Sequence, residues 1–215
     1  MSVTGFDTQR VGEMFDGGVQ LASVQASFSV VDTRPIDRGM LKLLQSRSSK
    51  GTVLFAHGTL MGGFLTDEWL GGPEPVAEKL ATSQLRKYYK WIAKWGSWDL
   101  LQEMLATLRR IGDRHGGVPI AAVAIAWVLA QPGVASVIVG TKPGGPNAAR
   151  NLGENRVALS LKLTKDDMGD IAAVQAKGTP LTSFLGDVGG EFHYKSRYKK
   201  KASTATAVPA VARQQ

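Results

Sequence analysis

The sequence contains no cysteine, so disulfide bonds and thiolate metal sites are both excluded. It has only three histidines, His57, His115 and His193, and they are too scattered to predict a metal site. No apolar run approaches the roughly 18 residues of a membrane-spanning helix. The first residues, MSVTGFDTQRVGEMF, lack the basic start and apolar run of a secretory signal. These absences favour a globular protein in the cytoplasm with no membrane partner.

Acidic residues are missing from the C-terminal end. From Tyr194 to Gln215 there are six basic residues and no Asp or Glu, which leaves 20 basic and 18 acidic residues in the rest of the chain. Most of the net charge of +8 therefore comes from this C-terminal end. Because the same segment also loses apolar periodicity, we expect a folded domain over residues 1–193 and a disordered basic tail over 194–215. The tail has few aromatic residues, so a nucleic-acid partner is not expected.

Buried strands are predicted at four places, each a short apolar or β-branched run next to Gly, Pro or Asp. They are Ser2–Phe6, Leu21–Val31, Thr52–Ala56 and Ala135–Gly140. None alternates cleanly between apolar and polar residues, which is typical of parallel strands covered on both faces. Helical patterns lie between the runs, so the sequence predicts an α/β fold with right-handed crossovers.

Helices are predicted where apolar residues recur at helical spacing. The predicted segments are Asp7–Phe15, Pro35–Ser46, Ser83–Trp95, Trp98–Arg114 and Pro119–Ala130. The last of these is apolar all round and should be buried. The segment Ser83–Trp95 carries an aromatic stripe opposite a basic one. Its pattern favours a surface helix whose aromatic residues pack on the body, with a lid over a ligand or a basic membrane-surface helix as alternatives.

Four segments carry a resemblance to a known family: VTGFDT, VQASFSVVDTRP, HGTLMGGFLTDEWLG and the long GGVPIAAVAIAWVLAQPGVASVIVGTKPGGPNAARNL. In this order and spacing they resemble strands five to eight of the aldo-keto reductases, over roughly residues 3–185. The resemblance implies a partial TIM (β/α)8 barrel, units five to eight only. It also implies NADP(H) bound at the carboxyl ends of the strands.

The resemblance also implies an absence. The family's catalytic Asp, Tyr, Lys and His belong to units one to four, which have no counterpart in this sequence, so no catalytic residue is predicted. The expected function is a truncated NADP-dependent oxidoreductase domain that would act on a small carbonyl compound only if the missing half completed it. The alternative is a non-catalytic half-barrel that binds a nucleotide or a partner chain. Val30, Leu54 and Ile138 are expected on a barrel face with no opposite wall, which predicts self-association or a partner chain.

One candidate site follows the last predicted strand: Gly140, Thr141 and Lys142, with Arg150 and Asn151 beyond them. A strand end that opens into a helix start offers free N–H groups and a positive dipole end, which suit a phosphate. Basic side chains would add charge-assisted contacts. The alternative is a turn with solvated basic residues. The resemblance implies contacts with the adenosine 2′-phosphate at these positions.

The second candidate site is the glycine-rich segment that follows the Thr52–Ala56 strand, with residues Gly58, Thr59, Leu60, Gly62 and Gly63. Glycine lets the backbone approach a ligand closely, and the resemblance implies that this loop runs along the pyrophosphate. It further implies that Gln25 binds the nicotinamide carboxamide and that His57 replaces the Tyr that stacks on the ring. Gly5 stands where the family has an Asn, and glycine has no side chain to make that hydrogen bond.

Overall fold

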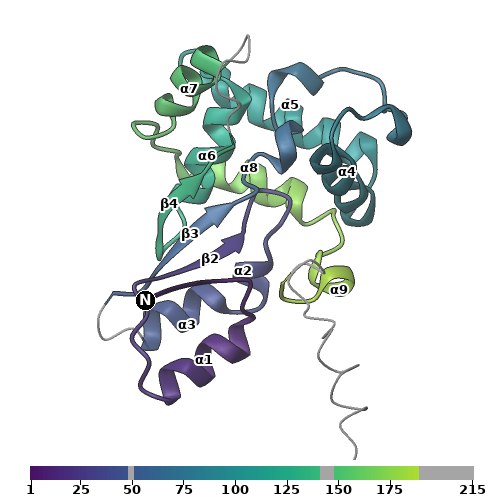
Figure 1. Ribbon diagram of the computed structural model, residues 1–215. Coiled ribbons are helices and arrows are strands. Elements are labelled where there is room, and N and C mark those ends of the chain that lie inside the picture. The colour runs from purple at the N-terminus through teal and green to yellow at the C-terminus, as the bar shows by residue number, and fades with distance from the viewer. Residues whose placement is uncertain (48–50, 141–147, 189–215) are drawn as a thin grey trace, which may run out of the picture.

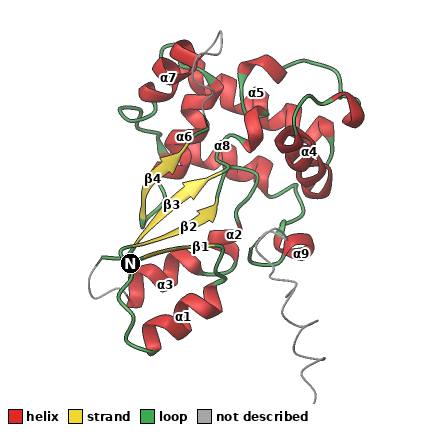
Figure 2. Cartoon of the chain, in the orientation of Figure 1, coloured by secondary structure: helices red, strands yellow, loops and turns green. Residues whose placement is uncertain are grey.

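The computed structural model describes residues 1–47, 51–140 and 148–188. Its centre is a parallel sheet in the order β1-β2-β3-β4, and the strand bounds are β1 (Ser2–Thr4), β2 (Ser23–Ser27), β3 (Val53–His57) and β4 (Val134–Ile138). Each strand is followed by helical structure before the next one begins (Figure 2). The predicted α/β class with a parallel sheet is confirmed. The predicted tail, residues 194–215, lies outside the described residues.

The helices fall into two groups around the sheet (Figure 1). Helices α1 and α3 lie side by side next to β1 to β3, whereas α4 to α8 gather beyond the carboxyl ends of the strands and along β4. Their bounds are α1 (Thr8–Asp16), α2 (Arg34–Asp37), α3 (Met40–Arg47), α4 (Ser83–Trp95), α5 (Trp98–Arg114), α6 (Ile120–Leu129), α7 (Ala148–Val157), α8 (Lys165–Gln175) and α9 (Thr182–Leu185). Short 3₁₀ turns occupy Met61–Gly63, Asp67–Trp69 and Ala77–Lys79.

Two predicted elements are wrong in extent. The single helix expected over Pro35–Ser46 is two helices, α2 and α3, because Gly39 between them has φ +77°, a left-handed conformation that ends a helix. The strand expected over Leu21–Val31 ends at Ser27. Beyond it, the Ser29 hydroxyl accepts hydrogen bonds from the Val31 and Asp32 N–H groups and forms a turn.

The two faces of the sheet differ in burial. Val24 pairs in register with Leu54, Ala56 lies on the same face, and all three are fully buried in the helical layer. The other face carries Gln25 and His57, which are partly exposed. Because successive side chains of a strand point to opposite faces, the structure separates an apolar covered face from an open and more polar one.

This separation corrects an expectation about the open face. Leu54 does not face an open barrel interior; it points into the helical layer and is 0% exposed. Val30 lies in the loop after β2 and is likewise fully buried. Of the three residues expected to be uncovered, Ile138 alone is, at 44% exposed.

A buried ion pair fixes the loop between β2 and α2. Arg34 and Asp32 are 2% and 0% exposed, and two hydrogen bonds join them, from Nε to Oδ1 at 2.7 Å and from Nη2 to Oδ2 at 2.8 Å. The Arg34 guanidinium also lies 5.0 Å from the ring centre of Trp91 on α4. From α8, Gln175 donates a hydrogen bond to the Val30 carbonyl at 2.8 Å. The loop therefore connects β2 to two helices that are remote in the sequence.

A second polar cluster fixes the start of α8. Thr164 and Asp167 form a capping box, and the Asp167 carboxylate also contacts His115 at 2.7 Å and Arg114 at 2.6 Å. Burial of this carboxylate opposes its ionisation, but the hydrogen bonds from His115, the Thr164 N–H and Arg114 outweigh burial and hold its pKa well below the ordinary range. His115 therefore joins the end of α5 to α8 and has a structural role.

The prediction that the aromatic stripe of α4 packs on the body of the protein is confirmed. Its bounds match the prediction, and its stripe of Tyr88, Trp91, Ile92 and Trp95 is buried in the main core. Helices α5 and α6 also form within a residue or two of their predicted ends, and α6 is buried almost throughout. Among the described residues, no helix is long and apolar enough to cross a membrane.

Replacement of Arg34 by Met should destabilise the fold strongly, because it leaves the Asp32 carboxylate buried without its partner. The expected loss is about 3–5 kcal/mol in the free energy of unfolding, measured by guanidinium denaturation. Arg38→Met is the matched control, since Arg38 is exposed and four residues away, and it should cost less than about 0.5 kcal/mol. Equal losses in the two variants would contradict a special role for the buried pair.

Candidate ligand-binding site

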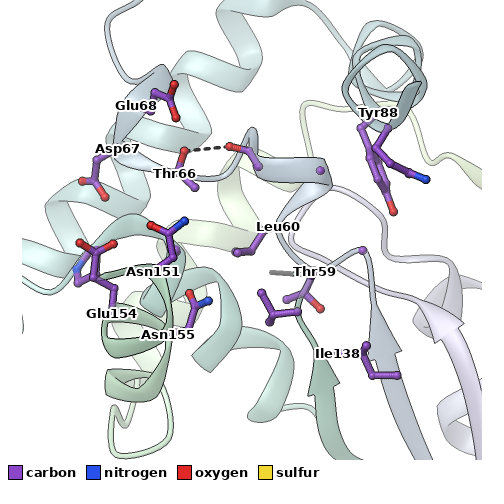
Figure 3. A pocket seen from close by; sticks show the side chains of 18 of the residues that line it. Thr59, Leu60, Thr66, Asp67, Glu68, Tyr88, Ile138, Asn151, Glu154 and Asn155 are labelled. Carbon is purple, nitrogen blue, oxygen red and sulfur yellow. Dashed lines mark hydrogen bonds between the residues drawn. The ribbon is translucent and has the colours of Figure 1, made fainter. Parts of the chain in front are cut away.

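A cavity of about 1020 Å³ opens at the carboxyl ends of β3 and β4. Its wall comes from the loop after β3, the end of β4, the start of α6, α7 and two residues of α4 (Figure 3). The carboxyl ends of parallel strands are where ligands bind in α/β folds. The lining residues are Gly58, Thr59, Leu60, Gly62, Gly63, Thr66, Asp67, Glu68, Gln84, Tyr88, Arg109, Gly117, Pro119, Ala121, Ile138, Val139, Gly140, Asn151, Glu154 and Asn155.

The loop after β3 has an unusual backbone. Gly58, Gly62 and Gly63 have φ values of +67°, +70° and +107°, and Met61 at +50° is the only described residue other than glycine with a positive φ. Met61 is fully buried, so its packing holds it in this conformation. Backbone outliers of this kind cluster at ligand sites. The loop thus presents its backbone, rather than long side chains, to the cavity.

Tyr88 of α4 packs directly on this loop. A Cβ built on Gly62 would lie 2.7 Å from Tyr88 Cδ2, and one built on Gly58 would lie 2.5 Å from Tyr88 Oη. Both contacts are closer than a side chain tolerates, so these two glycines are required by the aromatic ring as well as by their φ values. The loop and α4 therefore form one wall.

Asp67 ties the far end of the loop to two helices. Its Oδ2 accepts the Ile120 N–H at 3.0 Å, and its Oδ1 accepts a hydrogen bond from Arg109 at 2.7 Å. Ile120 begins α6, whose preceding Pro119 offers no side-chain cap, so Asp67 serves as the cap from 53 residues away. Arg109 also binds the Val118 carbonyl at 2.7 Å. These two charged residues stabilise the cavity wall.

Helix α7 forms the opposite wall with Asn151, Glu154 and Asn155 (Figure 3). Asn151 was predicted from the sequence as a site residue, whereas Glu154 and Asn155 were not. They stand three and four residues further along the same helix, so they share its face, and helical spacing alone could have found them. Glu154, Asp67 and Glu68 make the charged part of the described lining mostly acidic, with Arg109 as its described cation.

Seven of the predicted site residues meet in this cavity: Gly58, Thr59, Leu60, Gly62, Gly63, Gly140 and Asn151. Gln25 and His57 do not line it; they lie on the open face of the sheet, where Gln25 pairs with Phe55, and His57 with Ser27 and Ile138. Thr141 and Lys142 lie outside the described residues. Arg150 belongs to α7, and its side chain is not described.

The model of the aldo/keto reductase family matches residues 1–176. The chain belongs to the aldo/keto reductase family. It is 29% identical over 156 residues to the protein tas of Escherichia coli, which covers 72% of this chain and 40% of tas. It is 27% identical over 155 residues to the aldo-keto reductase str7 of Strobilurus tenacellus, covering 70% of this chain and 41% of str7.

A solved relative shows the same fold. The glycerol dehydrogenase of Gluconobacter oxydans superposes with a TM-score of 0.61 at 17% identity, over 83% of this chain and 49% of that one. The chain thus spans about two fifths of these two curated relatives and about half of this solved aldo-keto reductase. The predicted family is confirmed.

Replacement of Gly62 by Ala should cost more stability than replacement of Gly71, although both have φ +70°. Gly71→Ala measures backbone strain alone, about 1–2 kcal/mol, because no atom lies within 4 Å of its added Cβ. Gly62→Ala adds the clash with Tyr88, about 1–3 kcal/mol more. Urea denaturation of both variants gives the difference, and a Tyr88→Ala background should abolish it. Equal losses in the wild-type background would show that the ring moves aside freely.

Proposed function

We propose that this chain corresponds to units five to eight of an aldo-keto reductase barrel and that its cavity binds NADP(H). One observation carries the proposal: the glycine loop after β3 and the α7 residues Asn151, Glu154 and Asn155 line a single cavity at the carboxyl ends of the strands. Both segments are those that the family resemblance assigns to the dinucleotide. In this proposal, backbone N–H groups of the loop and of the start of α7 donate hydrogen bonds to the phosphate oxygens.

Two features of the chain fit this ligand. Thr59 is a lining residue of the cavity and is 1% exposed, and its hydroxyl has no hydrogen-bond partner in the described part of the chain. The glycines leave the loop backbone open to close approach. The charged part of the described lining is mostly acidic. We assign the 2′-phosphate to Lys142 and Arg150, as the family resemblance implies.

The chain should prefer NADP(H) to NAD(H). Each charge-assisted contact of Lys142 and Arg150 with the 2′-phosphate is worth about 1.5–3 kcal/mol, so the two dissociation constants should differ more than tenfold in calorimetry. Lys142→Ala should remove most of this preference, whereas Lys162→Ala, an exposed lysine outside the lining, should not. Equal affinities for the two dinucleotides, unchanged by Lys142→Ala, would contradict the assignment.

By itself the chain should not reduce carbonyl compounds with NADPH. We assign no catalytic residue to it, because the family's catalytic Asp, Tyr, Lys and His have no counterparts in this sequence and a hydride donor alone lacks its general acid. Absorbance of NADPH in the presence of a panel of small aldehydes measures this. Steady consumption of NADPH that survives His57→Ala would show that another group of the chain performs the proton transfer.

An alternative function is that of a non-catalytic half-barrel that binds a nucleotide or a partner chain. The observation that favours it is the open face of the sheet, together with the outer strands β1 and β4, each of which pairs on one side only within the described residues. Unpaired strand edges are templates for association.

We therefore expect a dimer, a complex or an aggregate in solution, since pairing of two open sheets or addition of a partner's strands would cover both edges. Light scattering at several concentrations measures the mass. A monodisperse species of 23.0 kDa with a cooperative melt would show that the open face and edges are stable without a partner.

A further inference from the structure

The outer side of α4 carries a row of cations. Lys90 and Lys94 stand one helical turn apart on this side, and both are exposed. Within the described part of the chain, neither of them forms an ion pair. The helix sequence, SQLRKYYKWIAKW, has four basic residues and no Asp or Glu to neutralise them. The exposed side of α4 therefore attracts negatively charged partners.

An exposed aromatic ring lies beside these cations. Phe184 belongs to α9, which lies next to α4 (Figure 1), and the Lys94 ammonium is 5.3 Å from the centre of its ring. Phe184 is 49% exposed, although Leu181 in the preceding turn is buried. A ring that enters the headgroup layer and lysines that contact anionic lipids are the two features of an interfacial membrane-binding surface.

The aromatic stripe of α4 itself faces the opposite way. Trp91 and Trp95 are buried in the core, and both are held by other elements. The Arg34 guanidinium lies 5.0 Å from the centre of the Trp91 ring, and the Trp95 carbonyl accepts a hydrogen bond from the Thr179 N–H. Insertion of α4 into a bilayer would have to break these contacts. The helix therefore stays in the fold and presents its basic side outward.

More cations lie around α9. Arg38 is exposed, and its guanidinium donates a hydrogen bond to the Thr182 carbonyl at 3.4 Å. The basic residues of 194–215 follow α9 in the chain, with no acidic residue among them. The stretch from Leu185 to Tyr194 spans at most roughly 30 Å even when fully extended. The tail therefore starts within reach of α9, and polybasic segments next to an anchor strengthen attachment to anionic membranes.

We propose that Lys90, Lys94 and Phe184 form a docking surface for an anionic lipid bilayer, to which residues 194–215 add further attraction. The exposed ring favours lipid over double-stranded nucleic acid, which offers phosphates but no apolar layer. This function lies beyond that of the cavity, because none of the three residues lines it. It replaces the expectation of no membrane partner, which rested on the lack of a spanning segment.

Sedimentation with lipid vesicles tests the docking surface on the full chain. The chain should bind vesicles of equal parts phosphatidylserine and phosphatidylcholine, and it should not bind vesicles of phosphatidylcholine alone. Removal of two cations by Lys90→Gln with Lys94→Gln should weaken partitioning about tenfold to thirtyfold. Phe184→Ser should weaken it about threefold to tenfold. Wild-type binding retained in either variant would overturn the docking surface.

Matched controls come from the connection between α7 and α8, which leads to the end of α5 remote from α4. Lys162→Gln with Lys165→Gln removes the same charge from two exposed lysines, and Leu159→Ser removes an apolar side chain that is 73% exposed. None of these changes should alter vesicle binding. Because none of the substituted side chains is buried, each variant should keep the wild-type melting temperature.

Four further results would overturn the docking surface. Failure of the wild-type chain to bind the anionic vesicles would do so directly. An equal loss in the control lysine variant would show a general effect of net charge. Lost binding after substitution of Lys199, Lys200 and Lys201 by Gln, with unchanged binding in the Lys90 and Lys94 variant, would assign the attraction to the tail alone. Tighter binding to a DNA duplex than to the vesicles at the same salt concentration would make nucleic acid the partner.

Discussion

The buried pair of Asp32 and Arg34 is the interaction on which most of the arrangement depends. It closes the turn after β2, lies against Trp91 of α4, and is followed directly by Pro35 at the start of α2. Neither charge has access to water, so the two hydrogen bonds between them are what makes their burial tolerable. A helix from the long segment between β3 and α5 is thereby held next to the strand ends, where it can form part of a site.

The cavity depends on a second constraint, the fit of Tyr88 against glycine. Gly58 and Gly62 accept positive φ values and leave space for an aromatic ring where any other residue would place a Cβ. This explains why a glycine-rich loop serves two purposes here. Its backbone is exposed to the cavity on one side, and on the other it holds the helix that delivers Tyr88.

The two walls of the cavity differ in the chemistry of their residues. The α7 wall begins with a helix start and includes Asn151, Glu154 and Asn155, whereas the region around Gly58 carries hydroxyls. The described α7 wall is therefore polar and acidic, whereas the wall around Gly58 is polar and uncharged. The open face of the sheet, with Gln25 and His57, adjoins the Gly58 end of the cavity and has no covering element within the described chain.

Local pattern alone determined much of this protein: the four strands, the bounds of α4 and α5, the burial of α6, and the family to which the chain belongs. The strands and helices follow from the periodicity of neighbouring residues, which a sequence shows directly. The family follows from the resemblance of four segments to known members. The same reasoning failed at Gly39, where one left-handed residue divides a continuous apolar pattern into two helices. It also failed at Leu54, because periodicity shows that a residue is buried but not which face of the sheet it points to.

Only the tertiary structure placed Tyr88 and Ser27 against Gly58, and Asp67 at the start of α6. Each of these depends on segments between 30 and 60 residues apart meeting in space, roughly the separation of successive strand–helix units. No spacing rule connects such residues along the chain. They are brought together by the parallel sheet, which carries the carboxyl ends of all its strands to one edge.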